Sequence, residues 1–389
     1  MTNHYSWGAR WIIPIDQPPI ENGLLTVVDG RIESIKPGKR NEAKEDLGDA
    51  ALMPLFVNAH THLEFSSLSQ PLGQPGMVIT DWILEVIKWR SEQTPAQKNQ
   101  AIAMGLKESL VCGSTGLGEI ATTPWFNELA LSEDILVRCF VERLGSNPDT
   151  AMSQIAEAKG WLQDANENLS WRPGLSPHAP YSTCDALFRN CMTWAEQDDL
   201  PVAMHLAESR EELQFMKTGQ GPFQQLFEKL GVPISPPAKK KPLDYLKALS
   251  KAQQALIVHG NYLTTPDLEF IAEHPNLSVV FCPRTHAFFN HDPYPITQML
   301  ERNINVAVGT DSRASNPDLN LLHELQVIRR RFPNISATKI LEMGTLAGAR
   351  ALKLDLEIGT LSPGRRGEFL TIPLESTTEP AEAILNFDF

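Results

Sequence analysis

Apolar residues along the middle of the chain gather into short runs, which are separated by longer segments with helical spacing. The short runs are rich in β-branched residues and end at turn residues or histidines, a pattern that predicts buried strands. The segments between them, such as residues 96–111 and 265–274, repeat their apolar positions as amphipathic helices do. The predicted strands cover residues 55–59, 114–119, 135–141, 172–177, 201–206, 255–260, 277–283 and 304–310.

Strands that alternate with helices indicate a parallel sheet with the helices outside it. Eight such units predict an α/β fold, a distorted (β/α)8 TIM barrel, over residues 53–355. Both chain ends are instead β-rich: residues 26–39 contain a hairpin signal around Asp29-Gly30, and residues 359–375 combine turn residues with a short apolar strand. We expect residues 1–52 and 356–389 to form one small β-sandwich domain. Residues 219–252 are predicted to be a long loop between helices, either a lid or plain surface.

Polar side chains stand at the ends of several predicted strands. His60 and His62 end the first strand, and their spacing of two residues puts both imidazoles on one side of it. His205, His259 and Asp311 end the fifth, sixth and eighth strands. The carboxyl ends of the strands meet at the face where barrel enzymes build their active sites. A single histidine there is commonly structural, but this combination predicts a site for Zn²⁺ or Fe²⁺ rather than Ca²⁺ or Mg²⁺.

The charge and the cysteine content indicate which kinds of partner and which cellular compartment to expect. The net charge of −13, from 34 basic and 47 acidic residues, disfavours a nucleic-acid or anionic-membrane partner. The five cysteines include no CxxC pair, which favours reduced thiols in the cytoplasm. The N-terminal residues lack a signal-peptide pattern, and no apolar run reaches the roughly 18 residues of a membrane span. We expect a soluble cytoplasmic protein with a small-molecule substrate.

Four motifs together resemble the amidohydrolase superfamily: NAHTH (58–62), MHLAES (204–209), VHG (258–260) and GTDSRASNPDLNLL (309–322). The resemblance extends over nearly the whole chain, including the β-rich ends. HLAES resembles the mononuclear branch that includes S-adenosylhomocysteine and methylthioadenosine deaminases and triazine chlorohydrolases. NAHTHLEFS together with FCPRTHAFF is most similar to aminodeoxyfutalosine deaminases.

The resemblance implies one divalent metal ion, with zinc as the first expectation and Fe²⁺ as the alternative. Its implied ligands are His60, His62, His205 and Asp311. Binuclear relatives carry a carbamylated lysine at the end of the fourth strand, whereas residues 171–180 here contain no lysine. This difference favours a single ion.

The resemblance also implies catalytic roles for residues around that ion. His259 would hydrogen-bond the attacking water, Asp311 would accept its proton, and Glu208 would carry protons to a ring nitrogen. His178, within SPHAPYS, would contact the substrate. Hydrolytic deamination needs an acid that protonates the ring nitrogen. Glu208 can serve as this acid if burial raises its pKa. The alternative for Glu208 is a surface carboxylate in the first turn of a helix.

Further substrate contacts are less specific. Glu64 offers a carboxylate that suits ribose hydroxyls, and Arg143, Arg284 and Arg313 offer guanidinium groups that suit a substrate carboxylate. For each of them a loop salt bridge is an equal alternative. Trp82 lies in an amphipathic segment, residues 80–90, which either caps the pocket or belongs to the core or a homodimer face.

The sequence therefore predicts a metal-dependent deaminase of a purine-type nucleoside, with aminodeoxyfutalosine as the first candidate and methylthioadenosine or S-adenosylhomocysteine next. The same site could instead displace chloride from an aromatic ring or open a cyclic amidine. The alternative to an enzyme is a non-catalytic scaffold that has kept the fold. The presence of all the implied metal ligands argues against this alternative.

Overall fold

The computed structural model describes residues 3–129, 131–163, 170–233, 239–374 and 379–387. Its centre is an eight-stranded parallel sheet in which each strand pairs with the next one along the chain. The strands are β6 (Phe56–Thr61), β7 (Ser114–Ala121), β8 (Leu136–Arg143), β9 (Trp171–Pro177), β10 (Val202–Leu206), β11 (Ala255–His259), β12 (Leu277–Phe281) and β13 (Asn305–Val308). All eight predicted strands are confirmed. Most strand ends differ from the predicted ones by one or two residues.

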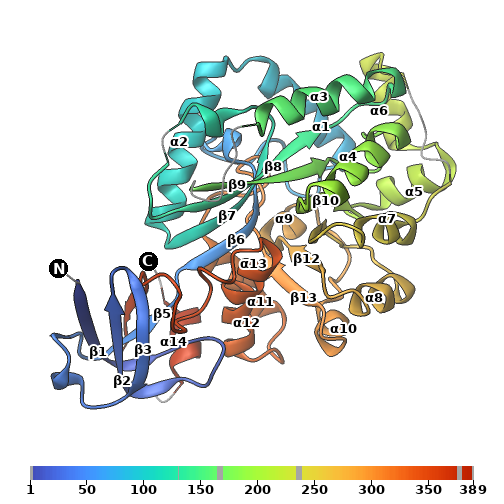
Figure 1. Cartoon of the computed structure of the whole chain (residues 1–389). Coiled ribbons are helices and arrows are strands. Elements are labelled where there is room, and N and C mark those ends of the chain that lie inside the picture. Colours follow the sequence, from blue (N-terminus) through green and yellow to red (C-terminus); the bar gives the residue numbers. More distant parts are fainter. Residues whose placement is uncertain (1–2, 130, 164–169, 234–238, 375–378, 388–389) are drawn as a thin grey trace.

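Helices surround this sheet, as the barrel prediction requires (Figure 1). They are α1 (Ile79–Ser91), α2 (Pro95–Val111), α3 (Ala151–Trp161), α4 (Asp185–Gln197), α5 (Arg210–Thr218), α6 (Pro222–Leu230), α7 (Pro242–Leu249), α8 (Thr265–Ala272), α9 (Pro283–Phe288), α10 (Ile296–Glu301), α11 (Leu321–Arg331), α12 (Ala337–Met343) and α13 (Leu346–Ala351). Short 3-10 helices are η1 (Arg40–Glu42), η2 (Leu63–Phe65), η3 (Trp125–Asn127) and η4 (Pro148–Thr150). Local sequence explains several helix starts: Thr94 and Gln97 form a capping box at α2, and Ser209 caps α5.

The first and last barrel strands meet along a seam that nearly closes the sheet. The Asp311 N–H donates to the His60 carbonyl at 3.0 Å. The Asn58 amide and Thr310 bond each other twice, at 2.7 and 3.0 Å. A Cβ added to Gly309 would lie 2.8 to 3.0 Å from the backbone and Cβ of His60, so only glycine permits this approach. The seam brings the two ends of the barrel sequence together at its carboxyl end.

The barrel interior is filled, and its two ends differ in polarity. Apolar side chains that range in size from Ala59 through Val258 to Phe140 occupy the middle. At the amino-terminal end of the strands, Arg138 donates to the carbonyl of Leu352, just after α13, at 3.0 Å, and so caps that helix. Polar and titratable side chains gather at the opposite, carboxyl end, where the candidate site lies.

The two chain ends meet in one six-stranded sheet beside the barrel (Figure 1). It contains β1 (His4–Ile12), β2 (Ile20–Val28), β3 (Arg31–Pro37), β4 (Glu45–Asp46), β5 (Ala50–Met53) and β14 (Leu370–Pro373). The predicted hairpin joins β2 to β3 through Asp29 and Gly30, whose positive φ angles of 48° and 77° suit a type I′ turn. Strand β14 pairs antiparallel with β5, so the ends associate as predicted.

The boundaries predicted for the small domain, residues 1–52 and 356–389, and for the barrel, residues 53–355, remain predictions. The last described helix, α14 (Pro380–Leu385), packs against α11 and α12 of the barrel, while β14 belongs to the small sheet. Residues 375–378 and 388–389 of the predicted small domain lie outside the described residues. Within the predicted 219–252 loop, α6 and α7 are helical, and residues 234–238 lie outside the described residues. In the described part of the chain, every helix is too short or too polar to cross a membrane.

The seam yields a test of fold stability. We expect Gly309→Ala to lower the free energy of unfolding by about 1–3 kcal/mol, because the added methyl group overpacks the β6–β13 contact. Urea unfolding measures this change. Gly160→Ala is the control, because a Cβ at this position in α3 meets no atom within 4 Å. It should leave the midpoint unchanged or raise it slightly, and equal midpoints for both variants would contradict the role of the seam.

Candidate metal centre and active site

Four imidazoles and one carboxylate converge at the carboxyl end of the barrel. The His60 ring lies 4.8, 5.0 and 5.7 Å from the rings of His62, His205 and His259. Asp311 Oδ1 lies 3.5 Å from His60 Nε2 and 3.6 Å from His62 Nε2. All five residues are buried, and the seam between β6 and β13 is what places Asp311 against the two histidines of β6. The structure thus brings together every metal ligand that the sequence predicts.

The free nitrogens of this cluster fit a metal ion. His60 Nε2 and His62 Nδ1 are buried and have no hydrogen-bond partner among the described residues. His205 uses Nδ1 to contact the His178 carbonyl at 3.0 Å, which leaves its Nε2 available. Buried polar nitrogens rarely lack partners, so such orphans need a reason. Three imidazoles with one carboxylate are the ligand type that Zn²⁺ and Fe²⁺ prefer.

Burial favours the neutral form of His62, His205 and His259, and metal binding requires neutral imidazoles. Burial lowers the pKa of His62, His205 and His259 well below the usual value, and neighbouring imidazoles add to the effect for each. Burial would raise the pKa of Asp311, but the adjacent imidazoles of His60 and His259 outweigh it and lower that pKa. The site therefore offers neutral nitrogens and an ionised carboxylate.

Backbone strain marks the loops that carry these groups. Ala207, His259 and Asp311 have positive φ angles of 55°, 67° and 57°, which residues other than glycine seldom adopt. Hydrogen bonds hold these conformations: Tyr294 donates to the His259 carbonyl at 2.8 Å, and Thr61 Oγ1 donates to the Asp311 carbonyl at 3.2 Å. Left-handed residues directly after β10, at the end of β11 and after β13 turn the backbone sharply at the site.

Glu208 lies beside the cluster on the loop after β10. Its Oε1 is 3.4 Å from His259 Nε2. Burial raises the pKa of Glu208 well above its usual value, and the charge of Asp311 adds to this. Two groups fix its backbone: the Glu212 carboxylate accepts the N–H groups of Ala207 and Glu208 at 2.9 and 2.8 Å, and Asn261 donates to the Glu208 carbonyl at 2.8 Å. The geometry thus presents a buried carboxyl group with a raised pKa to the site.

His178 and Trp82 lie at the same end of the barrel. The His178 ring is 4.9 Å from the His205 ring, and its Nδ1 contacts Ser182 Oγ at 2.5 Å. Burial lowers the pKa of His178 to about 3. Trp82, on α1, donates from Nε1 to the Ala314 carbonyl at 3.1 Å, so it ties α1 to the loop that follows Asp311. Their substrate contacts stay predictions, which the position of His178 supports.

The three predicted arginines are held elsewhere. Arg143 lies on the outer face of β8, where its guanidinium stacks 4.0 Å from the Trp161 ring. Arg313 pairs with Glu108 of α2 at 2.8 Å. Their geometry supports the salt-bridge or packing alternative, and a contact to substrate stays an unsupported prediction for both.

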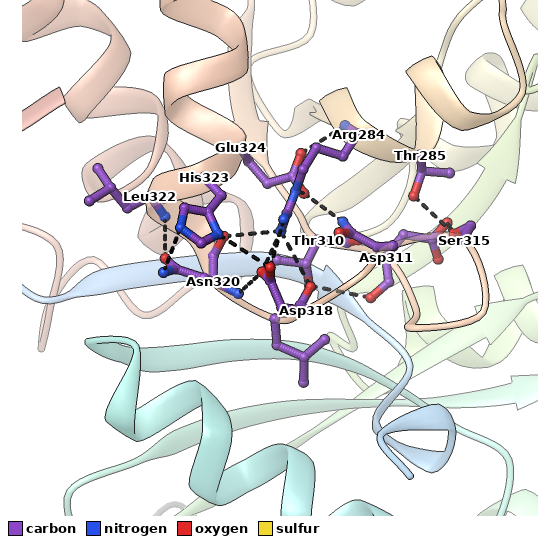
Figure 2. A network of polar contacts seen from close by, with 12 residues as sticks. Arg284, Thr285, Thr310, Asp311, Ser315, Asp318, Asn320, Leu322, His323 and Glu324 are labelled. Carbon is purple, nitrogen blue, oxygen red and sulfur yellow. Dashed lines mark hydrogen bonds and ion pairs between the residues drawn. The ribbon is translucent and has the colours of Figure 1, made fainter. Parts of the chain in front are cut away.

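Arg284 belongs to a structural network behind Asp311 (Figure 2). It pairs with the fully buried Glu324 at 2.6 Å and with Asp318 at 2.7 Å. Ser315, on the same loop, donates to Asp311 Oδ2 at 3.1 Å. The predicted substrate contact of Arg284 also lacks support, because this network engages its guanidinium in the packing behind the site.

The structure places two residues beside the site that the sequence does not predict there, Glu142 and Arg90. Glu142, the inward-facing neighbour of Arg143, has Oε1 3.8 Å from His178 Nε2. Burial raises the pKa of Glu142 to about 7. Arg90, at the end of α1, donates to the buried Glu64 carboxylate. Strand β8 is buried at every position, so its pattern does not single out Glu142, and nothing in the sequence links Arg90 to Glu64.

Comparisons with known proteins agree with this site. The model of the amidohydrolase family matches residues 51–388. A 5-methylthioadenosine/S-adenosylhomocysteine deaminase of Nitratidesulfovibrio vulgaris is 28% identical over 92% of this chain and 80% of its own length. An aminodeoxyfutalosine deaminase of Deinococcus radiodurans is 29% identical over 84% of this chain and 78% of its own length.

A solved structure shares the fold. The aminofutalosine deaminase of Helicobacter pylori in complex with methylthio-coformycin superposes with a TM-score of 0.85 at 23% identity, over 98% of this chain and 95% of that one. Both the barrel and the small sheet therefore have counterparts in a known protein.

The ligand set yields a test of metal binding. We expect His205→Ala to lose the metal ion, because the substitution removes one of the convergent nitrogens. Elemental analysis after gel filtration measures metal per chain. The matched control is His274→Ala, a histidine bonded to the Phe270 carbonyl at the end of α8, which should keep the full metal content. Equal metal content in both variants would contradict the assignment.

Proposed function

Because the chain belongs to the amidohydrolase family, we propose that it is a metal-dependent deaminase that hydrolyses the exocyclic C–N bond of a purine-type nucleoside and releases ammonia. One observation carries the proposal: the buried carboxyl of Glu208, whose pKa is raised by burial, stands 3.4 Å from His259, beside the free nitrogens of the metal cluster. Deamination needs an acid for the ring nitrogen next to the group that activates water.

We propose that a single ion occupies this centre, held by His60, His62, His205 and Asp311, with zinc first and Fe²⁺ second. The bound ion supplies Lewis acidity that lowers the pKa of water to about 7. The donor set of the cluster supports either metal. The five free cysteines support the further proposal that the enzyme works in the cytoplasm. A homodimer stays a prediction.

The side chains move protons in a balanced sequence. Asp311 accepts one proton of the attacking water while the oxygen adds to the amidine carbon. Glu208 donates its proton to the ring nitrogen in the same step, and His259 hydrogen-bonds the added oxygen. Asp311 then gives its proton to the amino group, the C–N bond breaks, and ammonia leaves. The hydroxyl proton of the adduct passes to Glu208 and restores the acid.

The relatives support a nucleoside that is modified at its 5′ end. Their names include an aminodeoxyfutalosine deaminase and a methylthioadenosine/S-adenosylhomocysteine deaminase. Ammonia release from a panel tests this point: aminodeoxyfutalosine, methylthioadenosine, S-adenosylhomocysteine, adenosine, guanine and cytosine. A strong nucleoside hit is expected. Metal-loaded protein that releases no ammonia from any of them, but releases chloride from a chlorotriazine, would overturn the proposal.

The acid is testable separately from the metal. We expect Glu208→Gln to keep the metal ion and to lower kcat by about 10²- to 10⁴-fold, because glutamine cannot donate the proton. Steady-state ammonia release and metal analysis on one preparation check both points. The control is Glu228→Gln on the exposed face of α6, which should retain activity. Normal deamination by Glu208→Gln would show that another group carries the proton.

A further inference from the structure

The loop that carries Glu208 closes on a second buried carboxylate. Glu212 is the third residue of α5, and none of its surface is exposed. Its two oxygens accept the N–H groups of Ala207 and Glu208, at 2.9 and 2.8 Å. The proposed proton transfers do not use this carboxylate. Glutamate is seldom fully buried, so its place beside the acid needs a reason of its own.

The backbone of this loop has the shape that a carboxylate can hold. Ala207 has a left-handed φ of 55°, which residues other than glycine seldom adopt. Around a left-handed residue, successive backbone N–H groups can converge and form a concave site for an anion. Glu212 fills that concavity from within the chain, with Oε1 on one N–H and Oε2 on the next. The carboxylate therefore stabilises a turn that is strained on its own.

The loop after β11 holds the other side of the same turn. Asn261 donates from Nδ2 to the Glu208 carbonyl at 2.8 Å, and the Tyr262 N–H donates to the Ala207 carbonyl at 3.0 Å. Glu212 thus binds the N–H groups of the turn while the neighbouring loop binds its carbonyl groups. With both sides bound, the backbone fixes the direction in which the Glu208 side chain leaves it.

Helix capping alone does not account for these contacts. Ser209 and Glu212 have the spacing of a capping box, in which a glutamate at the third helical position accepts the N–H of the cap residue. Here the carboxylate reaches past the cap residue, to the N–H groups one and two positions earlier. The contacts of Glu212 therefore extend beyond the helix end to the backbone of the acid itself.

A proton donor works only within hydrogen-bond reach of the atom that it protonates, and a misplacement of about 1 Å can cost about 10²-fold in rate. We propose that Glu212 is a positioning residue for the reaction, which holds the carboxyl of Glu208 beside His259 through the backbone of residues 207–208. This inference rests on the proposed deaminase function and deepens it. The acid is then a unit of two carboxylates, of which one moves the proton and the other fixes its position.

The first experiment uses Glu212→Gln in metal-loaded, full-length protein, with the best nucleoside of the ammonia panel. The amide keeps the size of the side chain but replaces one acceptor with a donor, so one backbone N–H loses its partner. We expect kcat to fall about 10- to 100-fold, with KM within about threefold of the wild type. Metal content should not change.

Ser209→Ala is the matched control. It removes the bond at 3.1 Å between the Ser209 hydroxyl and the Glu212 N–H, which caps α5, and keeps both carboxylates. We expect a lower unfolding midpoint and a kcat within about threefold of the wild type, because only the helix cap is lost.

A double-mutant cycle tests whether Glu212 acts through Glu208. When Glu208→Gln has already removed the acid, adding Glu212→Gln should lower kcat by less than about threefold more. A general structural role would instead multiply the two losses. Glu212→Asp keeps a carboxylate at a shorter reach and serves if the glutamine variant folds poorly. It should lose less kcat than Glu212→Gln and show the same lack of additivity.

The outcomes separate this inference from the proposed function. An unchanged kcat in both Glu212 variants would overturn the positioning role and leave the deaminase standing. Multiplied losses in the double variant, or loss of the metal ion from Glu212→Gln, would assign Glu212 to general stability. An equal loss of kcat in Ser209→Ala would reduce its role to helix capping. A wild type that deaminates no nucleoside, or a Glu208→Gln variant with normal turnover, would overturn the proposed chemistry and the positioning role with it.

Discussion

The contact between the first and last barrel strands is the constraint on which the site depends. Asn58 and Thr310, 252 residues apart, bond each other twice, and the Asp311 N–H bonds the His60 carbonyl. Without this seam the carboxylate that follows the eighth strand would not meet the histidines of the first. Gly309 permits the approach because it has no Cβ. The contact that closes the barrel is therefore the same contact that assembles the cluster of histidines and Asp311.

Much of the fold and the metal centre could be predicted from the sequence because both follow from short-range rules. Buried parallel strands appear as apolar runs, and their carboxyl ends always share one face of a barrel. Once the strand ends are placed, His60, His62 and Asp311 are expected to converge, and in the structure Asp311 Oδ1 lies 3.5 Å from His60 Nε2 and 3.6 Å from His62 Nε2. The motif predicts Glu208, and its burial explains its raised pKa.

The surroundings of the centre were less predictable, for two physical reasons. Strand β8 is buried on both faces, so its pattern does not tell which of Glu142 and Arg143 points inward, and the sequence therefore favours the wrong one of the two as a neighbour of the site. Long side chains also choose partners that only the tertiary fold brings near: Arg284 reaches Glu324, 40 residues away, and Arg90 reaches Glu64. A charged residue near a strand end is ambiguous until those partners are known.

The sharing of the small sheet between both chain ends has a consequence for synthesis on the ribosome. Strand β5 leads into β6 through only Pro54 and Leu55, yet its outer edge is covered by β14, which is translated last among the strands. The nascent chain therefore carries an uncovered strand edge and an open barrel for most of its synthesis. Contacts this distant along the chain form slowly, and exposed strand edges invite aggregation. Protection of the growing chain by chaperones, rather than the stability of the finished enzyme, would then limit how much active protein a cell obtains.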